Sequence, residues 1–249
     1  MKGNKKLIER VTRRVKLRLV EDAEQDRLFR QQAVDVYESL VDYLKSGGEL
    51  IEFGRVVTID MFTDLEEQAP NPLQIRFDEE RKSSTDAAYR NTADGPEIVL
   101  FVLEKDIYDS VEEARREMVR GLQNHAKVFM HEYIHYLDDR RTELGIEDLA
   151  GYETGGGKKK MSVYYSDPIE VNAYFQSGLA QLESTLEVPG VLDTHMKRNW
   201  NESFRDFKDW FFDEHIPPRM QFNIDDDQEK RLINRLYGFW EEVIMQKYT

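Results

Sequence analysis

The sequence contains no cysteine among its 249 residues. Disulfide bonds, Cys-ligated zinc and thiol nucleophiles are therefore excluded. Long hydrophobic runs are also missing, because the longest aliphatic and aromatic run, residues 98–103, is far too short to cross a bilayer. No apolar segment follows the basic N-terminus, as one would in a secretory signal. These absences predict a cytoplasmic (intracellular) protein without a signal peptide or a membrane span.

Positive charge is scarce outside the N-terminal segment. Residues 1–20 hold eight Lys or Arg and one Glu, a net charge of +7, which leaves -21 for the rest of a chain whose total is -14. An acidic body repels nucleic acid and anionic lipid, so only the basic N-terminal segment could attract either of them. Docking of that segment on its own acidic protein is the interpretation we favour.

Hydrophobic spacing and composition divide the chain into four parts. Residues 1–48 are predicted to be an N-terminal helical segment, because apolar residues recur there at helical spacing. Residues 49–141 are predicted to form a small sheet followed by a long helix. Residues 142–165 are polar and rich in Gly and Lys, which predicts a flexible loop. Residues 166–249 return to helical spacing and predict a helical C-terminal lobe of about three helices.

Short runs of β-branched and aromatic residues, separated by Pro, Gly, Asn and Asp, predict the strands of the sheet. These strands are expected at residues 56–59, 73–77, 87–90 and 98–103. Ser110 followed by Glu113 then predicts the start of a helix. Apolar residues at helical spacing continue from Met118 to Leu137, which favours one long helix.

A metal-binding motif lies within this long helix, where residues 131–135 read His-Glu-Tyr-Ile-His. In a helix, positions i and i+4 are about 40° apart around the axis and about 6 Å apart along it, so His131 and His135 can hold one ion. Glu132 lies beside the first histidine, where it can deprotonate a water on the same metal. Zinc is the predicted ion, because it lowers the pKa of its water and polarises a carbonyl group.

A catalytic zinc site needs a third protein ligand and an open fourth position. Arg141 stands ten residues after His131, where some zinc peptidases have a third histidine, and the chain offers no cysteine. A carboxylate from a later helix remains. Asp167-Pro168 opens such a helix, Glu170 lies in its first turn, and the small Ala173 lets two helices approach closely, so Glu170 is preferred. The alternative carboxylates are Asp167, Glu183 and Glu153.

These elements together resemble the gluzincin-type minimal metallopeptidases, small zincins that are frequent in phages and mobile elements. The resemblance covers roughly residues 86–176. It consists of the histidine pair, a strand with Ala88-Tyr89, a strand with Ile98-Val99-Leu100, and a later helix that begins D-P-x-E-x-x-A. The H-E-x-x-H element is the sharpest part of this pattern.

The resemblance implies that three residues hold the zinc ion: His131, His135 and Glu170. It also implies that Glu132 is the general base and that substrate lies along a sheet edge above the metal. One position departs from thermolysin-like enzymes, which have an Asp four residues after the third ligand, where this chain has Tyr174. A hydrogen bond that orients a histidine is then expected from Asp138 or Asp139.

Further residues have suitable chemistry without a decisive pattern. An oxyanion stabiliser, usually Tyr, His or Arg, is expected opposite the base. The sequence does not choose among four candidates: Tyr164, Tyr165, His195 and His215. His125 lies on a different helix face from His131 and is not predicted to be a ligand. Aromatic residues at helical spacing between 200 and 211 are predicted to pack the core of the C-terminal lobe.

The predicted fold is α+β and zincin-like, with a small twisted sheet, an active-site helix and a helical C-terminal lobe. The predicted function is that of a zinc metallopeptidase, a hydrolase that cleaves an amide bond of a protein or peptide with a zinc-bound water activated by Glu132. The alternative is a non-catalytic, zinc-stabilised interaction protein, such as an inhibitor that binds a host factor. Glu132 favours the hydrolase, because a purely structural site has no use for it. Nucleic-acid binding through residues 1–20 is disfavoured by the acidic body.

Overall fold

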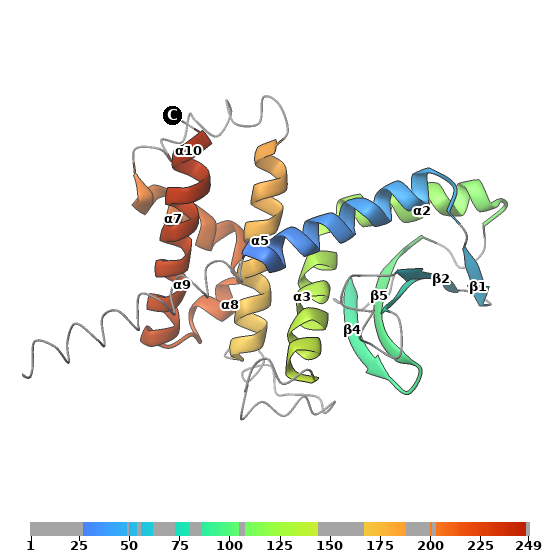
Figure 1. The fold of residues 1–249 in the computed structure, drawn as a ribbon, viewed down its shortest axis with the longest axis horizontal. Helices are drawn as coiled ribbons and strands as arrows, with labels where there is room; N and C mark the ends of the chain where they lie inside the picture. Colours follow the sequence, from blue (N-terminus) through green and yellow to red (C-terminus); the bar gives the residue numbers. More distant parts are fainter. Residues whose placement is uncertain are drawn as a thin grey trace, which may run out of the picture.

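The computed structural model describes residues 27–48, 50–53, 56–61, 73–79, 86–104, 108–143, 167–187, 200 and 203–247. Within these residues, a five-stranded sheet and the helices around it form a mixed α+β structure (Figure 1), so the predicted α+β class is confirmed. The basic segment 1–20 lies outside the described residues, and so does the predicted loop 142–165 except for its first two residues.

The sheet has the strand order β1-β2-β3-β5-β4, in which β3 and β5 are parallel and all other neighbours are antiparallel. Its strands are β1 (Ile51–Phe53), β2 (Val56–Met61), β3 (Leu73–Glu79), β4 (Ala87–Thr92) and β5 (Gly95–Leu103). The four predicted strands are confirmed, and β1 is an addition. Gly95, at φ 124°, provides the left-handed residue that turns β4 into β5. This strand order places β4 at one edge of the described sheet.

The helices are a first helix over residues 27–45, α2 (Val111–Asn124), α3 (Ala126–Glu143), α5 (Pro168–Glu187), α7 (Phe204–His215), α8 (Pro218–Gln221) and α9 (Asp226–Phe239). A π-helical stretch, η2 (Trp240–Ile244), joins α9 to α10 (Met245–Lys247). The described helices include none with the length and hydropathy of a membrane span.

The prediction of one long helix through the motif is wrong, because the chain breaks at His125 into α2 and α3. His125 leaves the helical conformation at φ -117° and ψ 27°, while its N–H still donates to Gly121 O. The break lets α2 and α3 run in different directions (Figure 1). Gly121 lets α2 approach β5 closely, since a Cβ there would lie 2.7 Å from Val102 Cβ. Both helices can therefore pack on the sheet.

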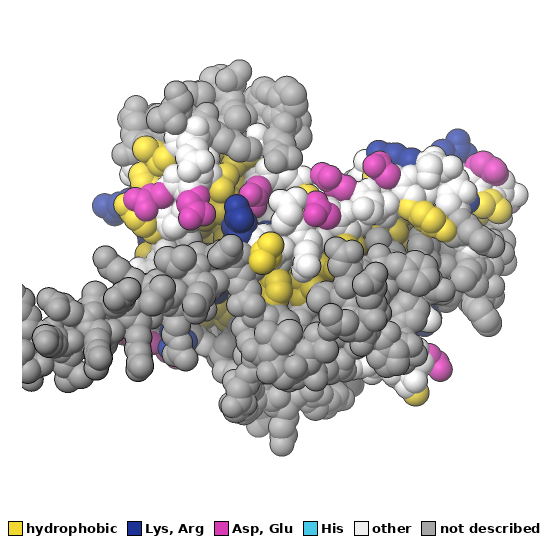
Figure 2. Space-filling model, in the orientation of Figure 1, with side chains coloured by type: hydrophobic (Ala, Val, Ile, Leu, Met, Phe, Trp, Pro, Cys, Tyr) yellow, Lys and Arg dark blue, Asp and Glu magenta, His cyan; other side chains and the backbone are white. Residues whose placement is uncertain are grey.

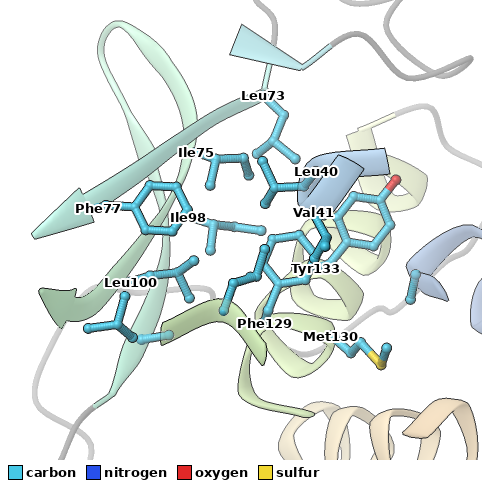
Figure 3. Packing of buried hydrophobic residues seen from close by; sticks show 14 of the residues in the cluster. Leu40, Val41, Leu73, Ile75, Phe77, Ile98, Leu100, Phe129, Met130 and Tyr133 are labelled. Carbon is cyan, nitrogen blue, oxygen red and sulfur yellow. The ribbon is translucent and has the colours of Figure 1, made fainter. Parts of the chain in front are cut away.

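The first hydrophobic cluster joins the sheet to the first helix, α2 and α3. Alternate residues of β3 are buried, and they point with residues of β5 toward the first helix and α3 (Figure 3). Figure 3 labels the following members: Leu40, Val41, Leu73, Ile75, Phe77, Ile98, Leu100, Phe129, Met130 and Tyr133. This cluster fixes the position of α3 against the sheet.

The second hydrophobic cluster lies in the helical C-terminal lobe, formed by α5 and α7 to α10. Its members come mainly from α5, α7 and α9, and many of them are aromatic. Trp200, Phe207 and Phe211 are almost fully buried, and Phe204 and Trp210 pack against them. The prediction that the aromatic residues between 200 and 211 pack the core of this lobe is confirmed. The two clusters meet where α3 packs against α5 (Figure 1).

Candidate metal centre

Helix α3 presents three different faces because of its helical geometry. One face buries apolar side chains, including Phe129 and Tyr133, against the sheet. Residues 131, 135 and 138 lie within about 60° of one another around the axis and form a second face, toward α5. Residues 132 and 139 lie within about 20° of each other on a third face. The motif therefore sends its two histidines and its glutamate in different directions.

Helix α5 brings a carboxylate to the second face of α3. Asp167 starts the helix, because its Oδ1 accepts a hydrogen bond from Ile169 N–H at 3.1 Å. Glu170 follows in the first turn, as predicted. Ala173, one turn on, is fully buried, and α5 packs directly on α3. The helix start thus places Glu170 opposite the two histidines.

Three ligand atoms of these helices converge. His131 Nε2 and His135 Nε2 are 3.1 Å apart, and Glu170 Oε2 lies 3.5 Å from the first and 3.3 Å from the second. Zinc binds such nitrogens and oxygens at about 2.0–2.1 Å, so two ligands of a tetrahedral zinc ion lie about 3.3–3.4 Å apart. The three separations fit one face of that tetrahedron. Among the described residues, these three form the one group of metal-ligating side chains this close together.

The arrangement leaves a buried carboxylate oxygen without a hydrogen bond. Glu170 Oε2 has no hydrogen-bond partner among the described residues, although both ring nitrogens are near it. Burial favours the neutral acid, but the two histidines outweigh burial and hold the pKa of Glu170 far below its usual value. Glu170 is therefore an anion that faces two imidazole nitrogens, which is the donor chemistry that zinc selects.

His135 responds to the same charges. Burial of its imidazole acts to lower its pKa, but Glu170, and after it Glu132 and Asp138, outweigh burial and raise the pKa of His135 above its usual value. The carboxylates thus give the centre a negative electrostatic potential that suits a cation.

The position that departs from thermolysin-like enzymes contacts a histidine directly. The rings of Tyr174 and His131 lie 4.3 Å apart, tilted by 56°. His131 Nδ1 is buried and has no hydrogen-bond partner in the described part of the chain. For His131, the expected hydrogen bond from Asp138 or Asp139 is therefore not found among the described residues. The α3 faces carry the two carboxylates toward α5 and β4: Asp138 accepts from Asn172 Nδ2 at 3.5 Å, and Asp139 from Tyr89 OH at 2.7 Å. The same expectation for His135 stays a prediction.

The third face of α3 meets the edge of the sheet. Glu132 does not join the three converging atoms; its Oε2 accepts a hydrogen bond from the backbone N–H of Tyr89, on β4, at 2.6 Å. The general-base candidate is therefore next to the candidate metal ligands in the chain, but its carboxylate is held by a different element. Tyr89 was missed as a functional residue in the sequence, where only its place on a short strand could be predicted.

The other candidates are not part of this group. Asp167 caps α5, and Glu183 pairs with Arg30 Nε at 3.4 Å. His215 is buried at the end of α7, where its ring packs against Phe211, and His125 lies 3.7 Å from Asp86 at the helix break. Four further candidates lie outside the described residues: Glu153, Tyr164, Tyr165 and His195.

Comparisons with protein families, with curated proteins and with solved structures found no match to this chain.

Proposed function

We propose that this protein is a zinc-dependent metallopeptidase with a zincin-like, gluzincin-type site. The observation that carries the proposal is the convergence of His131 Nε2, His135 Nε2 and Glu170 Oε2 at separations of 3.1–3.5 Å. Three protein ligands leave a fourth position of a tetrahedral zinc ion for chemistry, whereas structural zinc sites use four. A zinc ion, when bound, would lower the pKa of a water and polarise the substrate carbonyl.

The residues around the metal ligands support hydrolysis. Glu132 is adjacent to His131 in sequence, yet its carboxylate is held by the sheet edge and not by the ligand group. It is therefore free to take the proton of the attacking water and to pass it to the leaving nitrogen. A site that only held a metal would gain nothing from a second, separately held carboxylate.

The sheet edge beside Glu132 supports an extended peptide as substrate. Among the residues that the structure describes, β4 pairs with β5 alone, so alternate residues of β4 direct their backbone groups away from the sheet. The bond between Phe101 N–H and Asp86 O sets this alternation, in which Ala87, Tyr89 and Asn91 face outward. An extended chain can add to such an edge through main-chain hydrogen bonds.

The test compares wild type with Glu132→Gln, using a quenched fluorescent peptide library and elemental analysis of both proteins. The variant should keep its zinc and its melting temperature but lose about 10²–10⁴-fold in cleavage rate, because it lacks the base. Glu183→Gln, which alters a carboxylate paired with Arg30, is the control and should cleave like wild type. Undiminished cleavage by Glu132→Gln with zinc in place would refute the hydrolase.

The same variant distinguishes a peptidase from the alternative, a non-catalytic interaction protein that is stabilised by zinc. If the chain acts by binding alone, its effect on cells that express it should persist in Glu132→Gln. If it acts by hydrolysis, the effect should disappear while partner binding remains.

A further inference from the structure

We propose that Tyr89 is a positioning residue for Glu132, and that the sheet edge, through the backbone N–H of Tyr89, sets the place of the general base. The proposal rests on the proposed hydrolase function for its kinetic consequence but on geometry for the contact. The Tyr89 N–H donates to Glu132 Oε2 at 2.6 Å, a short charge-assisted hydrogen bond across 43 positions of sequence.

Tyr89 contacts the helix at two points. Its hydroxyl donates to Asp139 Oδ2 at 2.7 Å, and Asn91 Nδ2 donates to the same oxygen at 3.1 Å. Glu132 and Asp139 are seven residues apart, so they lie on one face of α3 about 10 Å apart along its axis. Tyr89 therefore binds this face of α3 twice: its backbone N–H binds Glu132, and its hydroxyl binds Asp139 two turns further along the helix. The two bonds fix β4 and α3 relative to each other.

The N–H that Glu132 uses is not needed by the sheet. Tyr89 stands opposite Ile98 in the antiparallel register, at a position whose backbone groups point away from β5. An outward N–H on an edge strand is normally left to water or to an added strand. Here it has a carboxylate acceptor, and that acceptor is the residue after a metal ligand. The neighbouring Tyr136 ring, 6.2 Å from the Tyr89 ring, supports the side chain from within the core.

This bond determines what Glu132 can do. A free glutamate side chain samples several rotamers, and catalytic groups must be held near one productive geometry. The Tyr89 N–H engages Oε2 and leaves Oε1 for the proton of the attacking water. It also means that this N–H is not available to an added peptide strand. Through Tyr89, β4 therefore holds the base at the same edge along which an extended peptide would lie.

The contact itself can be tested without any activity. Amide hydrogen exchange of the full, zinc-loaded chain should show a protected Tyr89 N–H, and Glu132→Ala should speed its exchange at least about tenfold while zinc content is unchanged. The Ala87 N–H, outward on the same edge, should be unaffected, and Glu183→Gln should leave Tyr89 protected. Fast exchange of the Tyr89 amide in wild type, or equal protection in Glu132→Ala, would overturn the proposal.

The kinetic consequence needs a variant that lacks this N–H. Pro is tolerated on an edge strand where the N–H faces outward, so Tyr89→Pro deletes the donor and Asn91→Pro is its matched control. Both variants lose one outward N–H and one hydrogen bond to Asp139 Oδ2, but only the first loses the donor to Glu132. Both are assayed on the peptide that wild type cleaves best from a quenched fluorescent library.

Tyr89→Pro should lower kcat by about 10–10²-fold with KM changed less than about threefold, because a misplaced base affects the chemical step. Asn91→Pro keeps the donor to Glu132, so its kcat should stay within about threefold of wild type, and any loss should fall on KM, because the variant removes an outward N–H of the edge to which substrate adds. Equal losses of kcat in the two variants would mean that only strand integrity matters, which contradicts the proposal. If Tyr89→Pro does not fold, Tyr89→Phe replaces it, because this variant keeps the N–H and loses only the hydrogen bond to Asp139. Its kcat should fall by less than the roughly 10–10²-fold expected of Tyr89→Pro, and its KM should be unchanged. Retained activity in Glu132→Gln would instead reject the hydrolase and leave the exchange result standing.

Discussion

The two hydrophobic clusters of this protein differ in how they are built. The sheet lobe, made of β1 to β5, the first helix, α2 and α3, has a core in which most residues are aliphatic and which draws on five or more elements. The helical lobe, α5 and α7 to α10, has a core with a larger share of aromatic residues, which come mainly from a few helices. The proposed metal ligands divide between the lobes: the histidines belong to α3, whose apolar face enters the first core, and Glu170 belongs to α5, whose apolar residues mainly enter the second. A metal here would crosslink two separately stabilised units.

Several polar contacts join the two lobes at this boundary. Asp138 of α3 binds Asn172 of α5, and Asn172 Oδ1 accepts from Arg235 Nη2 of α9 at 2.9 Å. Arg30 of the first helix is buried beside Glu183 and Gln176 of α5. Asp and Glu side chains are also visible on helices of both lobes in Figure 2. Burying the charge of an anionic centre is unfavourable unless it is paired, so a cation bound here would offset a cost that an apolar boundary does not have.

The largest expected effect follows from removing the ligand that the helical lobe contributes. Glu170→Gln should weaken zinc affinity by at least about 10²-fold, since even residues that only orient ligands are worth 10–100-fold. Glu183→Gln and Asp167→Asn, on the same helix, should stay within about threefold. Competition with a zinc-sensitive dye measures all three. Equal affinities in wild type and Glu170→Gln would move the ligand role to another carboxylate.

The second effect tests whether metal stabilises both lobes together. At a free zinc concentration of 100 times Kd, binding should add about 3 kcal/mol to the free energy of unfolding. All three tryptophans, Trp200, Trp210 and Trp240, are in the helical lobe, so fluorescence reports that lobe. Exchange of β5 amides reports the sheet lobe. Zinc should raise stability by both probes, and a change in only one lobe would contradict a shared site.

The third effect is a pH dependence of stability that arises from one residue of the helical lobe, His215. Burial, and after it Lys127, lowers the pKa of His215 to about 3. The folded state therefore keeps His215 neutral, while the unfolded state binds a proton below its usual pKa of about 6.5. This contribution is complete above pH 6.5 and is lost as pH falls toward the folded pKa, at a cost of about 2 kcal/mol between pH 6.5 and 5. Denaturant unfolding of chelated protein should show this loss in wild type and not in His215→Phe. Parallel pH curves would show that His215 is not the cause.

The smallest effects compare helical glycines in the two lobes. Gly121→Ala should destabilise by about 1 kcal/mol or more, because the added Cβ would lie 2.7 Å from Val102 Cβ. Gly238→Ala should stabilise by about 0.5–1 kcal/mol, because nothing lies within 4 Å of its Cβ position and Ala favours a helix. Thermal unfolding measures both. A gain in Gly121→Ala would mean that α2 does not approach β5 as closely as described.

The sequence predicted what depends on local pattern. Short runs of β-branched and aromatic residues indicated four strands, and Asp167-Pro168 indicated the helix start that puts Glu170 in a first turn. The break at His125 could not be predicted, since helical spacing continues across it and only packing on the sheet makes the turn favourable. The bond from Tyr89 to Glu132 joins residues 43 positions apart, and no local pattern encodes such a contact. The partners of the carboxylates on α3 could not be predicted for the same reason, because they depend on which elements surround each face of the helix.

The most direct test of a shared zinc centre is metal analysis of the full chain purified without chelator, combined with zinc X-ray absorption. About one zinc per chain is expected, bound by two imidazoles and a carboxylate, and His131→Ala should abolish it. Absence of a first-row metal in wild type, or undiminished zinc in both His131→Ala and Glu170→Gln, would contradict a site formed by α3 and α5.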